Sequence, residues 1–213
     1  QKLAGILMDN WADAVTTQPS SFLIRAIVWV CCGLSARPKV GEEKKRNYKG
    51  QFLLNVLTLN GCDGSIFDTQ KFTQKGTMLV SELVNFSKTK TLATGFEQLS
   101  EQQIQEMSCN KYTSRLIQAV LASKTMPEEI KEKIIGAFDK NSWETLITDT
   151  FGSRVFEKIW EFVDVKRKQE IMKVLVGIHN SSKFWKFAML RCDLYLFRKS
   201  RKDWVEKMKK SKN

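Results

Sequence analysis

The sequence predicts an all-α fold made of stacked helical repeats. The 213 residues include only 3 prolines and 11 glycines, which favours helices over a turn-rich β architecture. Apolar residues recur with helical spacing in four segments, and these segments follow one another at similar intervals. Outside the predicted helices, no stretch alternates apolar and polar residues as a strand would.

Four segments share one pattern of side chains. Each begins with a hydroxyl residue, has a large residue or an arginine in the second place, and has a polar residue in the fifth; the third, fourth, seventh and eighth places are apolar. The segments are residues 21–28, 77–84, 114–121 and 153–160. At about 100° per residue, the apolar places share one arc of a helix, and the first, second and fifth places share another. Each copy is therefore predicted to bury one face and to present a triad of side chains on the other, as a solenoid binding surface requires.

The spacing of the segments indicates a repeat array. Ser114 and Ser153 are 39 residues apart, and Thr77 and Ser114 are 37 apart. The interval from Ser21 to Thr77 is 56 residues, which leaves room for a basic insertion. Because the chain begins inside an amphipathic run at Gln1, we expect it to be a piece of a longer protein.

A fifth, weaker copy begins at Lys186, with Phe187 in the second place and Leu190 where a polar residue is expected. Terminal repeats are often atypical because they cap the stack. The sequence thus predicts one repeat array over residues 1–213. Its predicted parts are repeats around 1–33, 51–90, 97–124, 127–163 and 164–197, a basic insertion over 34–50 and a basic tail over 198–213.

Further helices are predicted from their start signals. Ser100 and Gln103 form a capping-box pattern that opens a helix through Met107. The other predicted starts are a capping box over 125–128 that opens a helix over 127–138, a cap at Asn141 or Ser142 for a helix through Ile147, and a cap at Asp164 for a helix over 165–176.

The formal net charge of +12 favours a polyanionic partner, and nucleic acid is the first candidate. A basic surface that is merely solvated is the plainer alternative. Half of the excess charge lies in residues 198–213, which hold eight Lys or Arg residues against two acidic ones. This tail is interpreted as a phosphate clamp, a nuclear-import signal or a solvated, frayed helix.

Little in the sequence favours an enzyme. His179 is the only histidine, and the chain lacks the glycine-rich loops that bind phosphates or dinucleotides, so we expect no catalytic site, no metal site and no cofactor. The five cysteines are irregularly spaced, which argues against a disulfide framework and favours a reducing compartment. No apolar run approaches the roughly 18 residues of a membrane span, so no membrane partner is expected.

The repeat helices resemble a known family. Residues 151–160, Phe-Gly-Ser-Arg-Val-Phe-Glu-Lys-Ile-Trp, and residues 112–121, Tyr-Thr-Ser-Arg-Leu-Ile-Gln-Ala-Val-Leu, resemble the RNA-binding helix of a Pumilio (PUF) repeat. Residues 152–204 also resemble the C-terminal portion of the nucleolar Pumilio-like ribosome biogenesis proteins of the Nop-nine type. The resemblance implies an α-solenoid of PUF-type repeats.

The resemblance also implies which side chains contact RNA. In a PUF repeat, two side chains read a base edge and the one between them stacks on a base. The implied edge readers are Ser114 with Gln118, suited to adenine, and Ser153 with Glu157, suited to guanine; Arg115 and Arg154 are the implied stacking residues. Ser21, Phe22 and Arg25 form a third candidate site.

The implied function is binding of precursor ribosomal RNA in the nucleolus or nucleus during small-subunit maturation, with other pre-ribosomal proteins as further candidate partners. Two alternatives remain open: a helical-repeat scaffold for protein interactions, and a cytoplasmic PUF-type regulator of messenger RNA. A protein-interaction scaffold does not require a hydroxyl residue, a stacking residue and a polar reader to recur on one face. For an mRNA regulator, more intact triads are expected than this chain contains.

Overall fold

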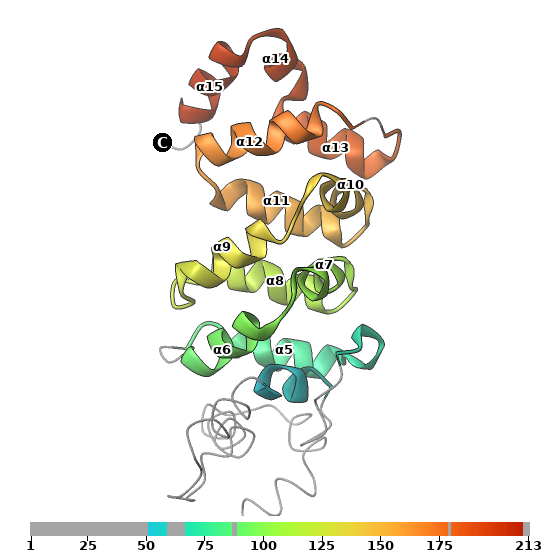
Figure 1. Ribbon diagram of the computed structural model, residues 1–213, viewed down its shortest axis with the longest axis vertical. Helices are drawn as coiled ribbons and strands as arrows, with labels where there is room; N and C mark the ends of the chain where they lie inside the picture. Colours follow the sequence, from blue (N-terminus) through green and yellow to red (C-terminus); the bar gives the residue numbers. More distant parts are fainter. Residues whose placement is uncertain (1–50, 59–66, 87–88, 179, 211–213) are drawn as a thin grey trace, which may run out of the picture.

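The computed structural model describes residues 51–58, 67–86, 89–178 and 180–210. Within these ranges the chain forms helices and no strand. The helices stack in layers along the long axis of the molecule, with the segment 51–58 toward one end of the described part and α14 and α15 at the other (Figure 1). The predicted all-α solenoid is confirmed.

Four helices form a central row in which each contacts the next. They are α5 (Gln74–Leu83), α8 (Thr113–Ala122), α11 (Gly152–Phe162) and α13 (Lys183–Cys192). The first three of them carry the predicted segments 77–84, 114–121 and 153–160. The row therefore places the predicted triads in register.

Other helices flank the central row in a pattern of three (Figure 1). One helix precedes each of α5, α8 and α11 in the chain, and one follows it. The preceding helices are the segment 51–58, α7 (Glu101–Cys109) and α10 (Lys140–Thr148), and the following ones are α6 (Lys90–Gln98), α9 (Glu128–Gly136) and α12 (Val165–Leu175). A 3-10 turn, η1 (Thr69–Lys71), precedes α5, and α14 (Leu194–Lys199) and α15 (Arg201–Lys210) end the stack. Where one repeat ends and the next begins stays a prediction.

Two predicted helix starts are confirmed by their caps. Ser100 Oγ accepts from Gln103 N at 3.2 Å, and Gln103 Oε1 accepts from Ser100 N at 2.9 Å, which completes the capping box of α7. Asp164 Oδ1 accepts from Arg167 N at 2.7 Å at the start of α12.

Two other predicted caps are wrong, although the helices exist. Helix α10 is capped by Asp139, whose carboxylate accepts from Ser142 N at 2.9 Å; Ser142 completes the box from within the helix. Helix α9 begins after Pro127 with no side-chain cap. Thr125, the predicted cap, lies two residues before that N-cap, and its Oγ1 donates to Val84 O at 2.7 Å.

Two central-row helices, α5 and α11, have a glycine near their start where another backbone comes close. A Cβ on Gly152 would overlap the carbonyl oxygen of Leu146 in α10, and a Cβ on Gly76 would overlap that of Leu57. In α8 the same place is held by Thr113, which is fully buried and donates its hydroxyl to Met107 O at 2.8 Å. In α5, α8 and α11 the second-place side chain therefore lies two residues after a buried contact with the preceding helix.

A chain of aromatic side chains continues the core from α10 to α15. Successive ring centroids lie 5.0 to 6.1 Å apart. The order is Phe138, Trp143, Phe156, Trp160, Trp204 and Phe197. The tryptophans in the described residues are buried, which confirms that they are packing residues. Residues 201–210 of the predicted basic tail form α15, in which Trp204 and Met208 are buried.

Candidate nucleic-acid interface

The second-place residue of every central-row helix is exposed. Met78 on α5 and Phe187 on α13 are 60% and 65% exposed, and Arg115 and Arg154 on α8 and α11 are also exposed. We call these four side chains the ladder. The ladder thus combines two exposed large apolar side chains with two exposed arginines, one on each central-row helix.

The first-place residues do not share this exposure, and the prediction of three exposed side chains per triad is wrong for them. Thr77, Ser114 and Ser153 are buried, with exposed fractions of 3%, 2% and 7%. Thr77 Oγ1 donates to Thr73 O at 2.9 Å, and Ser153 Oγ donates to Thr150 O at 3.2 Å. In α5, α8 and α11 the first place is therefore held by a small, buried hydroxyl residue, and the hydroxyls of Thr77 and Ser153 bond to the backbone at or just before the start of their helix.

The fifth-place residues of α5, α8 and α11 are half-buried. Gln118 Nε2 donates to Ser114 O at 3.2 Å, and Ser81 Oγ donates to Thr77 O at 2.9 Å. Glu157 forms no salt bridge with any described residue. The carboxylate is thus available to a ligand that donates hydrogen bonds.

A pocket of about 390 Å³ opens between α11 and α13. It brings together the triad of α11 and the ladder residue of α13. The lining residues are Ser153, Arg154, Glu157, Phe184, Phe187, Ala188 and Arg191. Arg191 is held in place by Glu161 of α11, whose carboxylate it meets at 3.3 Å, and Lys158 lies 2.8 Å from the same carboxylate. The hydrogen bond from Lys158 and the two positive charges lower the pKa of Glu161 below its ordinary value.

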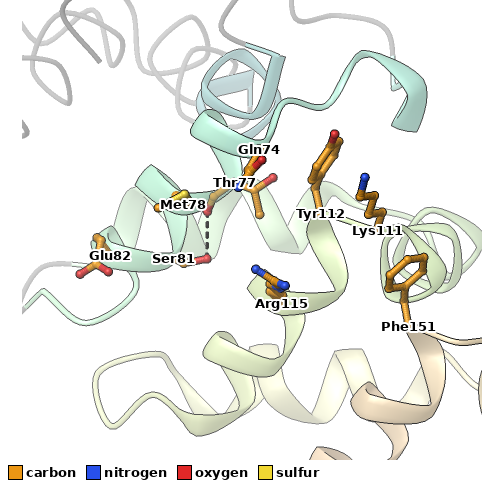
Figure 2. Close-up of a pocket in the computed structure, with 9 residues that line it drawn as sticks. All are labelled: Gln74, Thr77, Met78, Ser81, Glu82, Lys111, Tyr112, Arg115 and Phe151. Atoms are coloured by element: carbon orange, nitrogen blue, oxygen red, sulfur yellow. Dashed lines mark hydrogen bonds between the residues drawn. The ribbon is translucent and has the colours of Figure 1, made fainter. Parts of the chain in front are cut away.

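A second pocket, of about 350 Å³, opens between α5 and α8. Figure 2 shows Arg115 pointing from α8 toward the α5 side near Ser81, with Tyr112 near Thr77 at the other end. The full lining is Gln74, Thr77, Met78, Ser81, Glu82, Lys111, Tyr112, Arg115 and Phe151. The two pockets are equivalent in position: each lies between neighbouring central-row helices and is walled by two ladder residues.

Several residues that line the two pockets were not predicted from the sequence. A recurring position in the repeat could have identified some of them. Tyr112, Phe151 and Phe184 each stand two residues before a first place, and all three line a pocket. An aromatic residue at this offset recurs in three copies of the repeat. Glu82 gave no such signal, because it occupies the sixth place, which the triad pattern does not include.

The last copy has an apolar residue in its fifth place, where the other copies have a polar one. Leu190, in its fifth place, is 78% exposed, and Lys186, in its first place, is also exposed. Phe187 retains a flat ring for stacking, but Leu190 cannot form hydrogen bonds with a base edge. The last copy therefore offers a stacking platform and no reader.

Other predicted features lie outside the described residues or outside the pockets. Ser21, Phe22, Arg25, His179 and the insertion over 34–50 lie outside the described residues. No group of three or more His, Cys, Asp or Glu side chains in the described ranges could hold a metal ion. Among the described helices, none has the length and apolar character needed to cross a membrane.

The two cysteine thiols in the described ranges, Cys109 and Cys192, have raised pKa values. Burial, together with the Asp149 carboxylate, raises the pKa of Cys109 to about 12. Burial also raises the pKa of Cys192. Because the thiolate is the reactive form, both side chains are poor nucleophiles at neutral pH. They serve the packing of α7 and α13.

Comparison with solved structures shows the fold. The structure of APUM23 with GGAUUUGACGG superposes with a TM-score of 0.72 at 15% identity, over 97% of this chain and 41% of that chain. The structure of APUM23 with its insert region deleted, with GGAAUUGACGG, gives a TM-score of 0.72 at 17% identity, over 97% and 42%. This chain thus spans less than half of the length of these structures. A search of curated proteins found no significant match.

The family is shown by the sequence model of the NOP9-like PUF repeat domain, which matches residues 62–181. The match spans α5 to α12 and so includes both arginines of the ladder and the pocket between α5 and α8. It agrees with the stacking of helices in threes and with the fold of the APUM23 structures. This chain belongs to the NOP9-like PUF repeat domain family.

Proposed function

We propose that this protein binds single-stranded RNA along the ladder, with bases stacked on Met78, Arg115, Arg154 and Phe187. The alignment of these four exposed side chains over two pockets carries the proposal. Unstacked bases of single-stranded RNA lie against aromatic rings and guanidinium planes, and their edges form hydrogen bonds with neighbouring side chains. The APUM23 structures with the fold of this chain are named for RNA sequences, which supports the proposal.

We propose that the side chains of each triad make different contacts with RNA. Arg115 and Arg154 stack on bases and add positive charge near the phosphates. Gln118 and Glu157 form hydrogen bonds with base edges, and the buried hydroxyls of Ser114 and Ser153 adjoin them. Ser21, Phe22 and Arg25 remain a proposed further site. The role is binding, and no chemical step is assigned to the chain.

The proposed cellular target is precursor ribosomal RNA in the nucleolus, where binding controls the access of other factors during small-subunit maturation. The NOP9-like family and the basic charge support this proposal. Crosslinking of the full-length protein to cellular RNA tests it. Enrichment of precursor ribosomal RNA agrees with the proposal, whereas enrichment of cytoplasmic messenger RNA contradicts it.

Replacement of Phe187 by alanine tests the ladder directly. Because a stacked base contributes about 1–3 kcal/mol, Phe187→Ala is expected to weaken RNA binding by about 10-fold. Fluorescence anisotropy with a labelled, purine-containing single-stranded RNA measures the change. Tyr195→Ala is the matched control, because Tyr195 is an aromatic residue that is 78% exposed but lines neither pocket. Equal affinities for the two variants are the result that contradicts stacking on the ladder.

A further inference from the structure

A lysine followed directly by an aromatic residue stands before the first place in two copies of the repeat. The pairs are Lys111 with Tyr112, just before α8, and Lys183 with Phe184, at the start of α13. Each ammonium lies over the adjacent ring, with Nζ 5.5 Å from the ring centroid in the first pair and 5.0 Å in the second. Both lysines are exposed, and neither forms a salt bridge with a described residue. Two equivalent positions of the central row thus present an ammonium group that has no carboxylate partner in the described part of the chain.

The first pair lies at one end of the pocket between α5 and α8. Figure 2 shows Lys111 and Tyr112 at this end and the Glu82 side chain at the opposite end, on the far side of Ser81. Apart from the ladder, the charged side chain at one end of the pocket is therefore basic and the one at the other end is acidic. A phosphate is attracted to the lysine end and repelled from the glutamate end.

The second pair stands in the same way beside the pocket between α11 and α13, which Phe184 lines. Around the fifth place at the other end, apart from the ladder, two acidic side chains stand against two basic ones, and both basic groups pair with one carboxylate at 2.8 and 3.3 Å. The acidic residues are Glu157 and Glu161, and the basic ones are Lys158 and Arg191. The unpaired positive charge at this pocket is thus again at the lysine end.

We infer that the phosphate backbone of bound RNA follows this lysine edge of the central row, where Lys111 and Lys183 each bind one phosphate. The inference rests on the proposed function and adds two phosphate-binding residues that the triads do not include. A lysine binds phosphate as a point charge, and the charge-assisted hydrogen bonds to a phosphate oxygen are stronger than the contact of the ammonium with a ring. The apolar stem of each lysine can stay against its ring while the ammonium reaches the phosphate.

The repeat of α11 lacks the lysine. Thr150 stands at the position of Lys111 and Lys183, although Phe151 keeps the aromatic ring. Directly before it, the Asp149 carboxylate accepts from two backbone N–H groups at 2.7 and 2.8 Å. This repeat therefore has no positive charge at the edge. With one base bound per repeat, the phosphates bound by the two lysines are expected to lie two nucleotides apart, with a phosphate between them that is not bound.

The first experiment removes both lysines. Lys111→Gln/Lys183→Gln is titrated with a labelled, purine-containing single-stranded RNA by fluorescence anisotropy across a salt series. Because each phosphate contact of a single strand contributes about 0.7 to the slope of log Kd against log salt concentration, the slope is expected to fall by about 1.4. The same dependence predicts a loss of affinity of about 10-fold near physiological salt. The matched control is Lys166→Gln/Lys173→Gln, at exposed positions of α12 outside both pockets, and its slope is expected to change by less than about half as much.

The second experiment adds a lysine where the pattern lacks one. Thr150→Lys is expected to raise the slope by about 0.7, because it supplies the missing contact at the edge. Thr145→Lys adds the same charge at an exposed position of α10 outside both pockets and is expected to leave the slope near that of the wild type.

The third experiment locates the phosphates. One uncharged methylphosphonate linkage is moved along the RNA, and the wild type is expected to lose affinity at two linkages. Lys111→Gln and Lys183→Gln are each expected to become insensitive at one of these two.

The inference is overturned if the lysine pair and its control change the slope alike, if Thr150→Lys and Thr145→Lys do so, or if each neutral linkage weakens the variants as much as the wild type. A loss of affinity in Phe187→Ala then still supports the proposed function. If no RNA binds, or if Phe187→Ala binds as tightly as the wild type, the proposed function fails and takes this inference with it.

Discussion

Replacing Trp204 with alanine is expected to destabilise the C-terminal end of the solenoid by about 3–5 kcal/mol. Trp204 is fully buried, and its ring packs against Trp160 at 6.1 Å and Phe197 at 5.0 Å. Its indole Nε1 donates to Cys192 O at 2.8 Å. Truncation thus leaves a large cavity and an unpaired carbonyl where α13, α14 and α15 meet.

Chemical denaturation measures the free energy of unfolding, and amide hydrogen exchange locates the loss. Because each unit of a repeat array contacts only its neighbours, the increase in exchange is expected in α12 to α15 before it reaches α5. Trp204→Phe keeps most of the packing but removes the hydrogen bond, so a smaller loss, about 1–3 kcal/mol, is expected. Tyr195→Ala is the exposed control and is expected to change stability by no more than about 0.5 kcal/mol. Similar unfolding midpoints for Trp204→Ala and Tyr195→Ala are the outcome that contradicts a capping role for α15.

The fold was largely predictable because the core of each central-row helix is a local, periodic signal. The third, fourth, seventh and eighth places of residues 114–121 and 153–160 are all buried. These places lie on one helical arc whatever the partner helix is, so sequence spacing alone identifies them. The fifth, degenerate copy also keeps this register, with Ala188 and Met189 buried and Phe187 and Leu190 exposed.

The candidate site was less predictable because its exposure depends on neighbouring helices. The helical wheel places Ser114 and Arg115 on the same polar arc, yet Ser114 is buried and Arg115 is exposed. Helix α8 packs between α5 and α11, and the burial of Ser114 in that packing is not contained in the sequence of any single segment. Thr125 likewise bonds outside its own helix start, because its hydroxyl donates to the carbonyl oxygen of Val84.

Removing both arginines of the ladder tests the central claim, that RNA binds by stacking along the central row. Arg115 and Arg154 are exposed and line the two pockets, one each. Loss of two stacking contacts is expected to weaken binding of single-stranded RNA by about 2 kcal/mol or more, about 30-fold in Kd. Neither side chain is buried, so the variant is expected to fold as the wild type does, which circular dichroism checks.

The matched control removes two positive charges elsewhere. Lys166 and Lys173 are exposed on α12 and line neither pocket. The measurement is fluorescence anisotropy of the wild type, Arg115→Ala/Arg154→Ala and Lys166→Ala/Lys173→Ala with one purine-containing single-stranded RNA, across a salt series. The ladder predicts a loss of about 30-fold for the arginine pair that persists at high salt, and a small, salt-sensitive loss for the lysine pair. If the two double variants lose the same affinity for RNA and both losses vanish at high salt, stacking along the ladder is contradicted. Binding would then depend on charge alone.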